Sequence, residues 1–171
     1  MSRIEGVVIG IVSNVDDPEQ QCRIKLRFPW LDDSYETEWV RIASPMAGKD
    51  RGMRFMPEVE DEALVAFEHG HQNLPYVIGF LHNGPDTVPN KSVPERMIRS
   101  VNGHAIRMLD STPSQGDKGA LVIEDSHGNR ITLSNGKITI HSTAVLQIDA
   151  PTIVLGGPGY RRLIAPNNNP I

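Results

Sequence analysis

A closely spaced histidine pair is the first feature of this chain that could support chemistry. The motif His69-Gly70-His71 would place two imidazoles on one side of an extended strand. A metal ion, however, needs several convergent ligands that a second shell of contacts holds in place. The pair also falls in a glycine-containing turn between two expected strands. We therefore expect no metal site and no cofactor.

Carboxylates and serines offer two further kinds of candidate. The carboxylate runs are Asp32, Asp33, Glu36 and Glu38, and Glu58, Glu60, Asp61 and Glu62. Glycosidase chemistry needs two carboxyl groups that face each other across a cleft and differ in pKa, whereas such runs more often solvate a surface or meet a basic partner. Histidines lie near Ser100, Ser126 and Ser142 in the sequence, but no Gly-x-Ser-x-Gly turn surrounds them. The sequence predicts no catalytic residue and a protein that is not an enzyme.

Aromatic residues provide a third possible chemistry, the stacking of nucleic-acid bases. The candidates are Trp30, Trp39, Phe28 and Phe67. Exposed aromatic side chains on small barrels bind single strands in this way. Trp39 and Phe67 lie in alternating segments and are expected in the core, while Trp30 follows a strand end and suits a subunit contact. A nucleic-acid-binding barrel with an oligomerising tail stays open at this point as the alternative function.

The distribution of charge argues against that alternative. Residues 1–90 carry 15 Asp and Glu against 8 Lys and Arg, while residues 91–171 carry 6 against 9. Nucleic-acid binding draws most of its affinity from Lys and Arg that meet phosphates. An acidic first half therefore favours a protein partner over a nucleic acid.

The composition is that of a globular chain, with 22% charged and 39% hydrophobic residues. No stretch approaches the roughly 18 to 20 apolar residues of a membrane span, and residues 1–5 lack the apolar centre of a signal peptide. We expect assembly in the cytoplasm. Cys22 is the sole cysteine, so an intrachain disulfide is impossible, and we expect it half-buried in a strand.

The first half of the chain alternates between short apolar segments and turns rich in Gly, Pro and Asp. Five strands are expected, at residues 6–12, 22–28, 38–42, 63–68 and 74–81. Five strands with this punctuation fit a small closed Greek-key barrel such as the OB-fold.

The last third carries four apolar pairs of the i, i+2 type, whose first members lie 7, 8 and 7 residues apart. Alternation puts each pair on one face of a short strand, and Asn-Gly and Ala-Pro turn the chain between strands. No helix covers this face, so other copies of the chain must bury it. The pairs are Ile131/Leu133, Ile138/Ile140, Leu146/Ile148 and Ile153/Leu155.

The ordered landmarks of the first half resemble the N-terminal OB domain of phage baseplate assembly protein V and of VgrG spike proteins. Residues 98–110 and 123–133 resemble the segments that open the trimeric β-helical needle of that family. The landmarks are Gly6-Val7-Val8-Ile9-Gly10, Asp17-Pro18, residues 23–30, Glu38-Trp39-Val40-Arg41-Ile42-Ala43, Arg51-Gly52, Pro57-Glu58-Val59, residues 62–68 and residues 75–84.

The resemblance implies an all-β protein in which an N-terminal OB-fold barrel (residues 1–85) and a Pro-rich linker (residues 86–96) precede an intertwined trimeric β-helix or β-prism needle (residues 97–155). Residues 156–171 would form the apex or bind a tip protein. The implied function is that of a noncatalytic central spike in a phage tail or a tail-like contractile injection machine, which docks on the baseplate hub and punctures a target cell envelope. The four apolar pairs would form the core of the homotrimer.

The resemblance also implies partners. Full VgrG proteins carry a hub domain before the barrel, whereas this barrel begins close to Met1, so we expect a separate hub protein. Trp30, Asp32 and Asp33 are the candidate hub contacts. The candidate contacts for a small tip protein of the PAAR type are Tyr160, Arg161, Arg162 and Leu163.

Two features of some family members are not expected here. Some relatives bind iron through a His-x-His near the needle tip, but no histidine follows His141. Others carry a lysozyme domain between the barrel and the needle, for which residues 83–94 leave no room. The second alternative, a cell-wall hydrolase, would need that domain.

Overall fold

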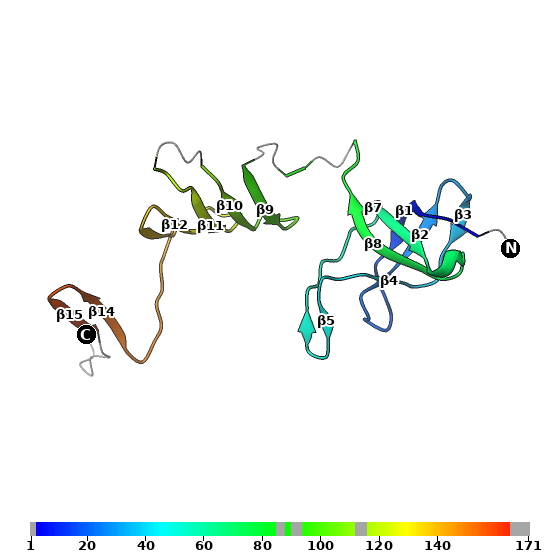
Figure 1. Ribbon diagram of the computed structural model, residues 1–171. Helices are drawn as coiled ribbons and strands as arrows, with labels where there is room; N and C mark the ends of the chain where they lie inside the picture. The colour runs from blue at the N-terminus through cyan, green and yellow to red at the C-terminus, as the bar shows by residue number, and fades with distance from the viewer. Residues whose placement is uncertain (1–2, 85–87, 90–93, 112–115, 165–171) are drawn as a thin grey trace. The chain divides into compact units, whose positions relative to one another are not determined.

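The computed structural model describes residues 3–84, 88–89, 94–111 and 116–164, without the side chains of residues 32–33 and 160–164. The chain divides into two compact units, Met1–Val88 and Pro89–Ile171. The described elements are strands and a single 3-10 turn, η1 (Glu68–Gly70) (Figure 1). No helix in the described part of the chain is long and apolar enough to cross a membrane.

The first unit is a closed barrel, because β1 pairs with both β2 and β7 in the strand order β1-β7-β8-β4-β2. The β4–β8 pairing is parallel, the other barrel pairings are antiparallel, and β3 extends the sheet beyond β2. This closure confirms the prediction of an all-β chain with an OB-like five-stranded barrel. The strands are β1 (Val7–Asn14), β2 (Arg23–Phe28), β3 (Asp32–Glu36), β4 (Val40–Ile42), β7 (Glu62–Phe67) and β8 (Pro75–Leu81).

Alternation along each strand fills the barrel interior. Inward side chains of β2 and β7 are buried while their neighbours remain accessible. Gly10 makes room for the largest of them, because a Cβ at that position would lie 3.0 Å from Cε1 of Phe28. The buried core consists of Val12, Ile24, Leu26, Phe28, Val40, Ala63, Val65, Phe67 and Val77.

Three local predictions in this unit need correction. Residues 32–36 form β3, a strand that was not expected because its side chains are polar. Cys22 lies just before β2 with a φ of 58°, so it is a half-buried turn residue and not a strand residue. Phe67 is in the core as predicted, but Trp39 is half-buried outside it, with Nζ of Lys25 5.4 Å from its ring centroid.

Asp17 organises the turn between β1 and β2. Its carboxylate accepts hydrogen bonds from the backbone N–H groups of Glu19, Gln21 and Arg23, and it pairs with the Arg23 guanidinium at 2.7 Å. The side chain is only 4% exposed. The bond from Arg23 is the largest cause that holds the pKa of Asp17 far below its usual 3.8.

Because of this turn, the stability of the barrel should decrease as the pH falls below about 4. Since the folded pKa of Asp17 is depressed, its contribution is complete above the unfolded value near 3.8 and is lost as pH falls toward the folded value. The Asp17→Asn variant should unfold at lower temperature than the parent at pH 7, and the difference should shrink as pH drops below about 4. Calorimetry between pH 2 and 7 measures both trends. A temperature difference that stays constant across this range would contradict the assignment.

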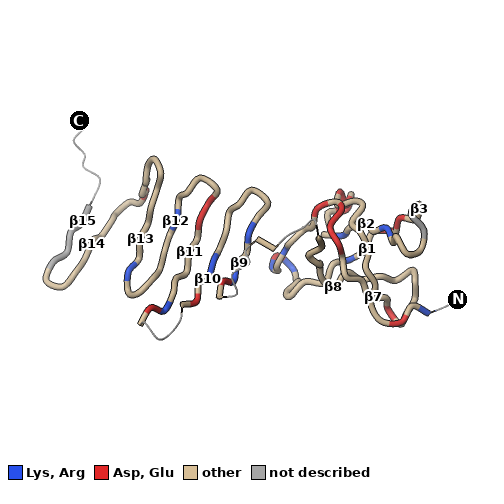
Figure 2. Tube along the Cα trace, turned by 90° about the horizontal axis from the view of Figure 1, so that it is seen from above, with Lys and Arg blue, Asp and Glu red and all other residues tan. Residues whose placement is uncertain are grey.

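The second unit is a meander of five antiparallel strands in the order β13-β12-β11-β10-β9, which run back and forth side by side in Figure 2. A separate hairpin of β14 and β15 follows. The strands are β9 (Glu95–Arg99), β10 (Ala105–Leu109), β11 (Ala120–Glu124), β12 (Arg130–Ser134), β13 (Lys137–His141), β14 (Ile153–Gly157) and β15 (Tyr160–Ile164).

Polar turns fix the register of the meander. Asn135-Gly136 joins β12 to β13 with φ values of 49° and 77°, the left-handed conformation that a two-residue hairpin turn requires. Asp125 accepts hydrogen bonds from the backbone N–H groups of His127 and Asn129, and Asn129 in turn accepts one from the backbone of Thr143. Side chains of the 125–129 turn thus close that turn and tie it to the segment after β13.

Two predictions about the rhythm of strands in this unit were wrong. Residues 142–152 contain no strand, so Leu146 and Ile148 do not lie in one. The regular strands were also expected to end before Gly156, where the needle segment stops and the apex begins, but β14 continues through Gly157 and the hairpin turns at Pro158-Gly159.

Candidate functional site

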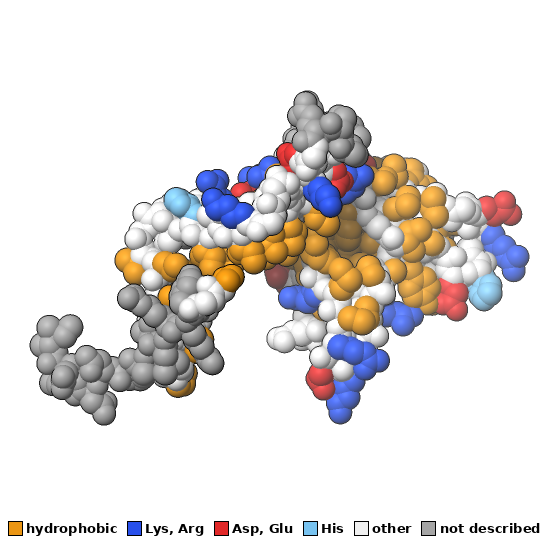
Figure 3. All heavy atoms as spheres, turned by 60° about the vertical axis from the view of Figure 1, so that its left-hand side comes forward, with side chains coloured by type: hydrophobic (Ala, Val, Ile, Leu, Met, Phe, Trp, Pro, Cys, Tyr) orange, Lys and Arg blue, Asp and Glu red, His pale blue; other side chains and the backbone are white. Residues whose placement is uncertain are grey.

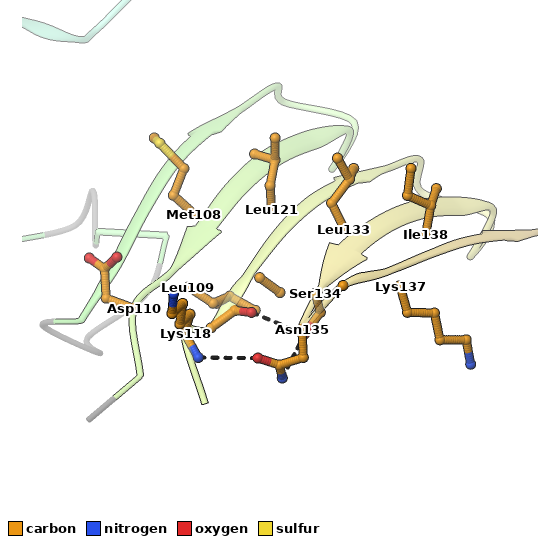
Figure 4. Close-up of a pocket in the computed structure, with 13 residues that line it drawn as sticks. Met108, Leu109, Asp110, Lys118, Leu121, Leu133, Ser134, Asn135, Lys137 and Ile138 are labelled. Carbon is orange, nitrogen blue, oxygen red and sulfur yellow. Dashed lines mark hydrogen bonds between the residues drawn. The ribbon is translucent and has the colours of Figure 1, made fainter. Parts of the chain in front are cut away.

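One face of the β9–β13 sheet is almost entirely apolar. The register aligns two rows of side chains across neighbouring strands. The first row is Ile98, Ile106, Ile123, Ile131 and Ile140, and the second holds Met108, Leu121, Leu133 and Ile138. We call these nine residues the apolar ladder face. Figure 3 shows hydrophobic side chains gathered on one side of this sheet, and Figure 4 shows the second row projecting to the same side.

The apolar ladder face is uncovered in the single chain. Its side chains range from 37% exposed at Leu121 to 68% exposed at Ile138. A contiguous apolar patch of this kind marks an interaction surface. Covering nine half-exposed side chains at about 1 kcal/mol each would contribute on the order of 10 kcal/mol per chain, before the entropy cost of association.

The opposite face of the sheet mixes apolar residues, of which Ala105 and Val122 are buried, with a network of ion pairs. Arg107 on β10 lies between Glu95 on β9 and Glu124 on β11, with 3.1 Å from its guanidinium to Glu124 and a second ion pair to Glu95. The Glu95 side chain is 4% exposed. The two carboxylates, Glu95 first, raise the pKa of Arg107 above its usual value, so it remains charged. These two ion pairs connect β9, β10 and β11 within the single chain.

Removing this central cation should destabilise the sheet. Arg107→Met would take the guanidinium away from two carboxylates, one of them nearly buried, at a cost of about 3 kcal/mol. Lys137→Met removes an exposed cation from the same unit and should change stability by less than about 0.5 kcal/mol. Urea unfolding followed by circular dichroism compares the two. Equal midpoints for both variants would contradict the role of Arg107.

The structure places the predicted core residues in three different environments. Ile131, Leu133, Ile138 and Ile140 lie together on the apolar ladder face. Leu146 and Ile148 are exposed in the segment without strands, while Ile153 and Leu155 lie on β14 in the separate hairpin. Of the four apolar pairs, only Ile131/Leu133 and Ile138/Ile140 therefore lie on one surface.

Five members of the apolar ladder face were missed in the sequence. They are Ile98, Ile106, Met108, Leu121 and Ile123. The same i, i+2 alternation occurs in β10 and β11 and could have revealed four of them. The signal was less regular there because longer connections separate β9, β10 and β11.

The predicted partner contacts are only partly within the described structure. Trp30 follows β2 and is 51% exposed, with its ring centroid 5.7 Å from that of Phe28. The backbones of Asp32 and Asp33 begin β3, and those of Tyr160, Arg161, Arg162 and Leu163 lie in β15. The side chains of these six residues lie outside the described part of the chain.

The residues weighed for metal binding and catalysis lie apart or in local pairs. His69 and His71 are exposed at the turn before β8. Glu36 accepts hydrogen bonds from Lys25 at 2.9 Å and Ser13 at 2.8 Å, and Glu60 pairs with Arg27. Within the described ranges, no group of three or more His, Cys, Asp or Glu side chains is arranged to hold a metal ion.

The architecture defines a class of protein, an OB-fold barrel joined to an antiparallel sheet that carries an open apolar face. Residues 8–82 match the family of the type VI secretion system and phage-baseplate injector OB domain. Its barrel belongs to that injector OB domain family. The whole chain is VgrG-like, because a VgrG spike protein matches it over most of its length.

Individual relatives agree with this assignment. The chain is 34% identical over 127 residues to the type VI secretion system spike protein VgrG5 of Pseudomonas aeruginosa. The aligned region covers 71% of this chain and 15% of that protein. It is 29% identical over 107 residues to the spike protein VgrG3 of Vibrio cholerae, covering 58% of this chain and 10% of that protein. The chain thus spans a small part of the length of these relatives.

Proposed function

We propose that this protein is a noncatalytic structural spike of a contractile tail or tail-like injection machine. Three copies would pack their apolar ladder faces around a common axis and form a β-helical needle. The observation that carries the proposal is the apolar ladder face itself, which a single chain leaves open. Similarity to VgrG spike proteins supports the same role.

A threefold arrangement suits both the geometry and the mechanical task. Two copies packed face to face would also cover the apolar rows, as in a β-sandwich. Three sheets around an axis instead give a closed, three-sided rod in which each chain buries its apolar side chains against two neighbours. Such repetitive packing makes a stiff linear object. A stiff rod transmits the force of contraction to its tip, which is what puncturing an envelope requires.

The barrel would connect this needle to the baseplate. Its hub contacts are proposed at Trp30, Asp32 and Asp33, where an exposed aromatic residue and two acidic residues follow closely in the sequence at the β2–β3 turn. The acidic excess of residues 1–90 favours a hub protein with a basic surface and disfavours nucleic acid. The protein would assemble in the cytoplasm as part of the baseplate.

The β14–β15 hairpin would carry the tip of the spike. Tyr160, Arg161, Arg162 and Leu163 lie on its second strand, which makes the hairpin a compact platform for a small tip protein of the PAAR type. Because the two strands form one unit, the appropriate truncation removes residues 152–171 together.

Particles that contain this truncated chain provide the experiment. Labelled chains should still appear at the baseplate end of the particles in electron micrographs, and the chain should still form trimers. The particles should lose their tip protein and their ability to kill target cells. Full-length chains that are absent from the baseplate end would contradict the spike function, and truncated particles that still pierce targets would contradict the tip role.

A further inference from the structure

A small apolar pocket lies on the barrel at the base of the hairpin that β5 (Ala47–Gly48) and β6 (Arg51–Gly52) form. Figure 1 shows this hairpin beside the barrel strands. The chain segments before and after the hairpin form one wall, and β8 forms the other. The cavity measures about 280 Å³. Its apolar walls include Ile42, Met53, Phe55, Met56, Ile78 and Phe80.

Backbone and hydroxyl contacts hold this pocket in shape. The Ser44 hydroxyl is within hydrogen-bond distance of the carbonyl oxygens of Met46 (3.0 Å) and Met53 (2.7 Å) on the two arms of the hairpin. The backbone N–H of Ala43 donates to the carbonyl of Val77 on β8 at 2.8 Å. The floor rests on the barrel core, against which Ile42 and Met56 pack. The cavity is therefore a built feature of the domain.

One cationic side chain lines this apolar pocket. Nε of Arg54 donates to Sγ of Cys22 at 3.1 Å. Among the described residues, Arg54 makes no ion pair with a carboxylate. Its guanidinium therefore keeps donors for an anion from outside the chain. This is notable because residues 1–90 carry an excess of acidic groups.

We propose that the pocket receives one large apolar side chain, next to a carboxylate, from a partner protein. The cavity is smaller than typical small-molecule sites of about 300 to 1,000 Å³ and suits a single anchoring side chain. A phenylalanine or leucine side chain would enter between Met53 and Ile78. The neighbouring Asp or Glu of the partner would form an ion pair with Arg54. Arg54 thus makes this pocket prefer a partner segment that carries a carboxylate.

The sole cysteine provides a direct reporter, because Cys22 lines the pocket. The probe is 3-phenylpropionate, an aromatic ring with a carboxylate, added to the full-length chain while Cys22 is alkylated with iodoacetamide. Protection follows 1 + [L]/Kd, so the alkylation rate should fall about threefold at a probe concentration of twice Kd. For neutral 3-phenylpropanamide, the Kd obtained from protection should be at least about tenfold higher, since the amide cannot form an ion pair with Arg54.

Two variants separate the pocket from general charge effects. Arg54→Gln should remove the preference for the carboxylate over the amide, when each variant is compared with its own rate without probe. Lys49→Gln removes a positive charge from the hairpin turn and should keep the preference. Absence of protection, equal protection by acid and amide in the parent chain, or an unchanged preference in Arg54→Gln would overturn the proposal. The proposal does not rest on the spike function, because probe and reporter act on the isolated chain.

Discussion

The Ile140→Asp variant is expected to be a monomer at micromolar concentrations at which the parent chain is a trimer. Ile140 lies at the end of the isoleucine row, paired with Ile131, and is 55% exposed in the single chain. The substitution removes about 1.5 to 3 kcal/mol of apolar burial per chain on assembly. It also brings three carboxylates close to one axis, where desolvation and mutual repulsion disfavour all three charges. Analytical ultracentrifugation measures the change.

The matched control is Thr139→Asp on the same strand. Thr139 pairs with Thr132 and lies on the face opposite the apolar ladder face, next in sequence to Ile140. This variant introduces the same charge but leaves the apolar ladder face intact, so it should assemble like the parent chain. If Ile140→Asp sediments and melts like the parent, the apolar ladder face is not the interface between copies.

Phe28→Ala should cause the largest loss of stability in the barrel. Phe28 is 2% exposed, and its ring lies 5.9 Å from that of Phe67 and against Gly10. Removing a buried phenylalanine costs about 3 to 5 kcal/mol, a large part of the roughly 5 to 15 kcal/mol that stabilises a domain. Thermal unfolding followed by tryptophan fluorescence should show a much lower midpoint.

Phe55→Ala provides the comparison of equal chemistry at the surface. Phe55 is 58% exposed at the pocket beside the hairpin, so its removal should change barrel stability by less than about 1 kcal/mol. If the Phe28→Ala and Phe55→Ala variants have the same unfolding midpoint, Phe28 is not the centre of the core.

Strict alternation made the barrel predictable from the sequence. Ile24, Leu26 and Phe28 alternate with basic residues, and the structure buries all three. The strand at residues 32–36 could not be found in this way, because pairing with β2 at the sheet edge, and not an apolar face, holds it in place. Cys22 fitted the alternation but has a positive φ, which the sequence pattern does not reveal.

The apolar ladder face was predictable only in part, since alternation specifies a face but not a pairing partner. In residues 131–140 the sequence specifies both the face and the pairing partner, because the Asn135-Gly136 turn joins two alternating segments of equal length. Leu146 and Ile148 alternate in the same way, but their segment pairs with no strand in the part of the chain that the structure describes, and it ends at Pro151, which lacks a backbone donor. Pairing across chains is beyond what one sequence specifies.

The mass of the purified chain in solution tests the central claim most directly. Size-exclusion chromatography with multi-angle light scattering should give three times the chain mass of 18.9 kDa, and the value should hold on dilution into the low micromolar range. A dimer would indicate that two sheets pack face to face and would exclude the three-sided needle. A stable monomer would contradict the account altogether, because nothing would then cover the apolar ladder face.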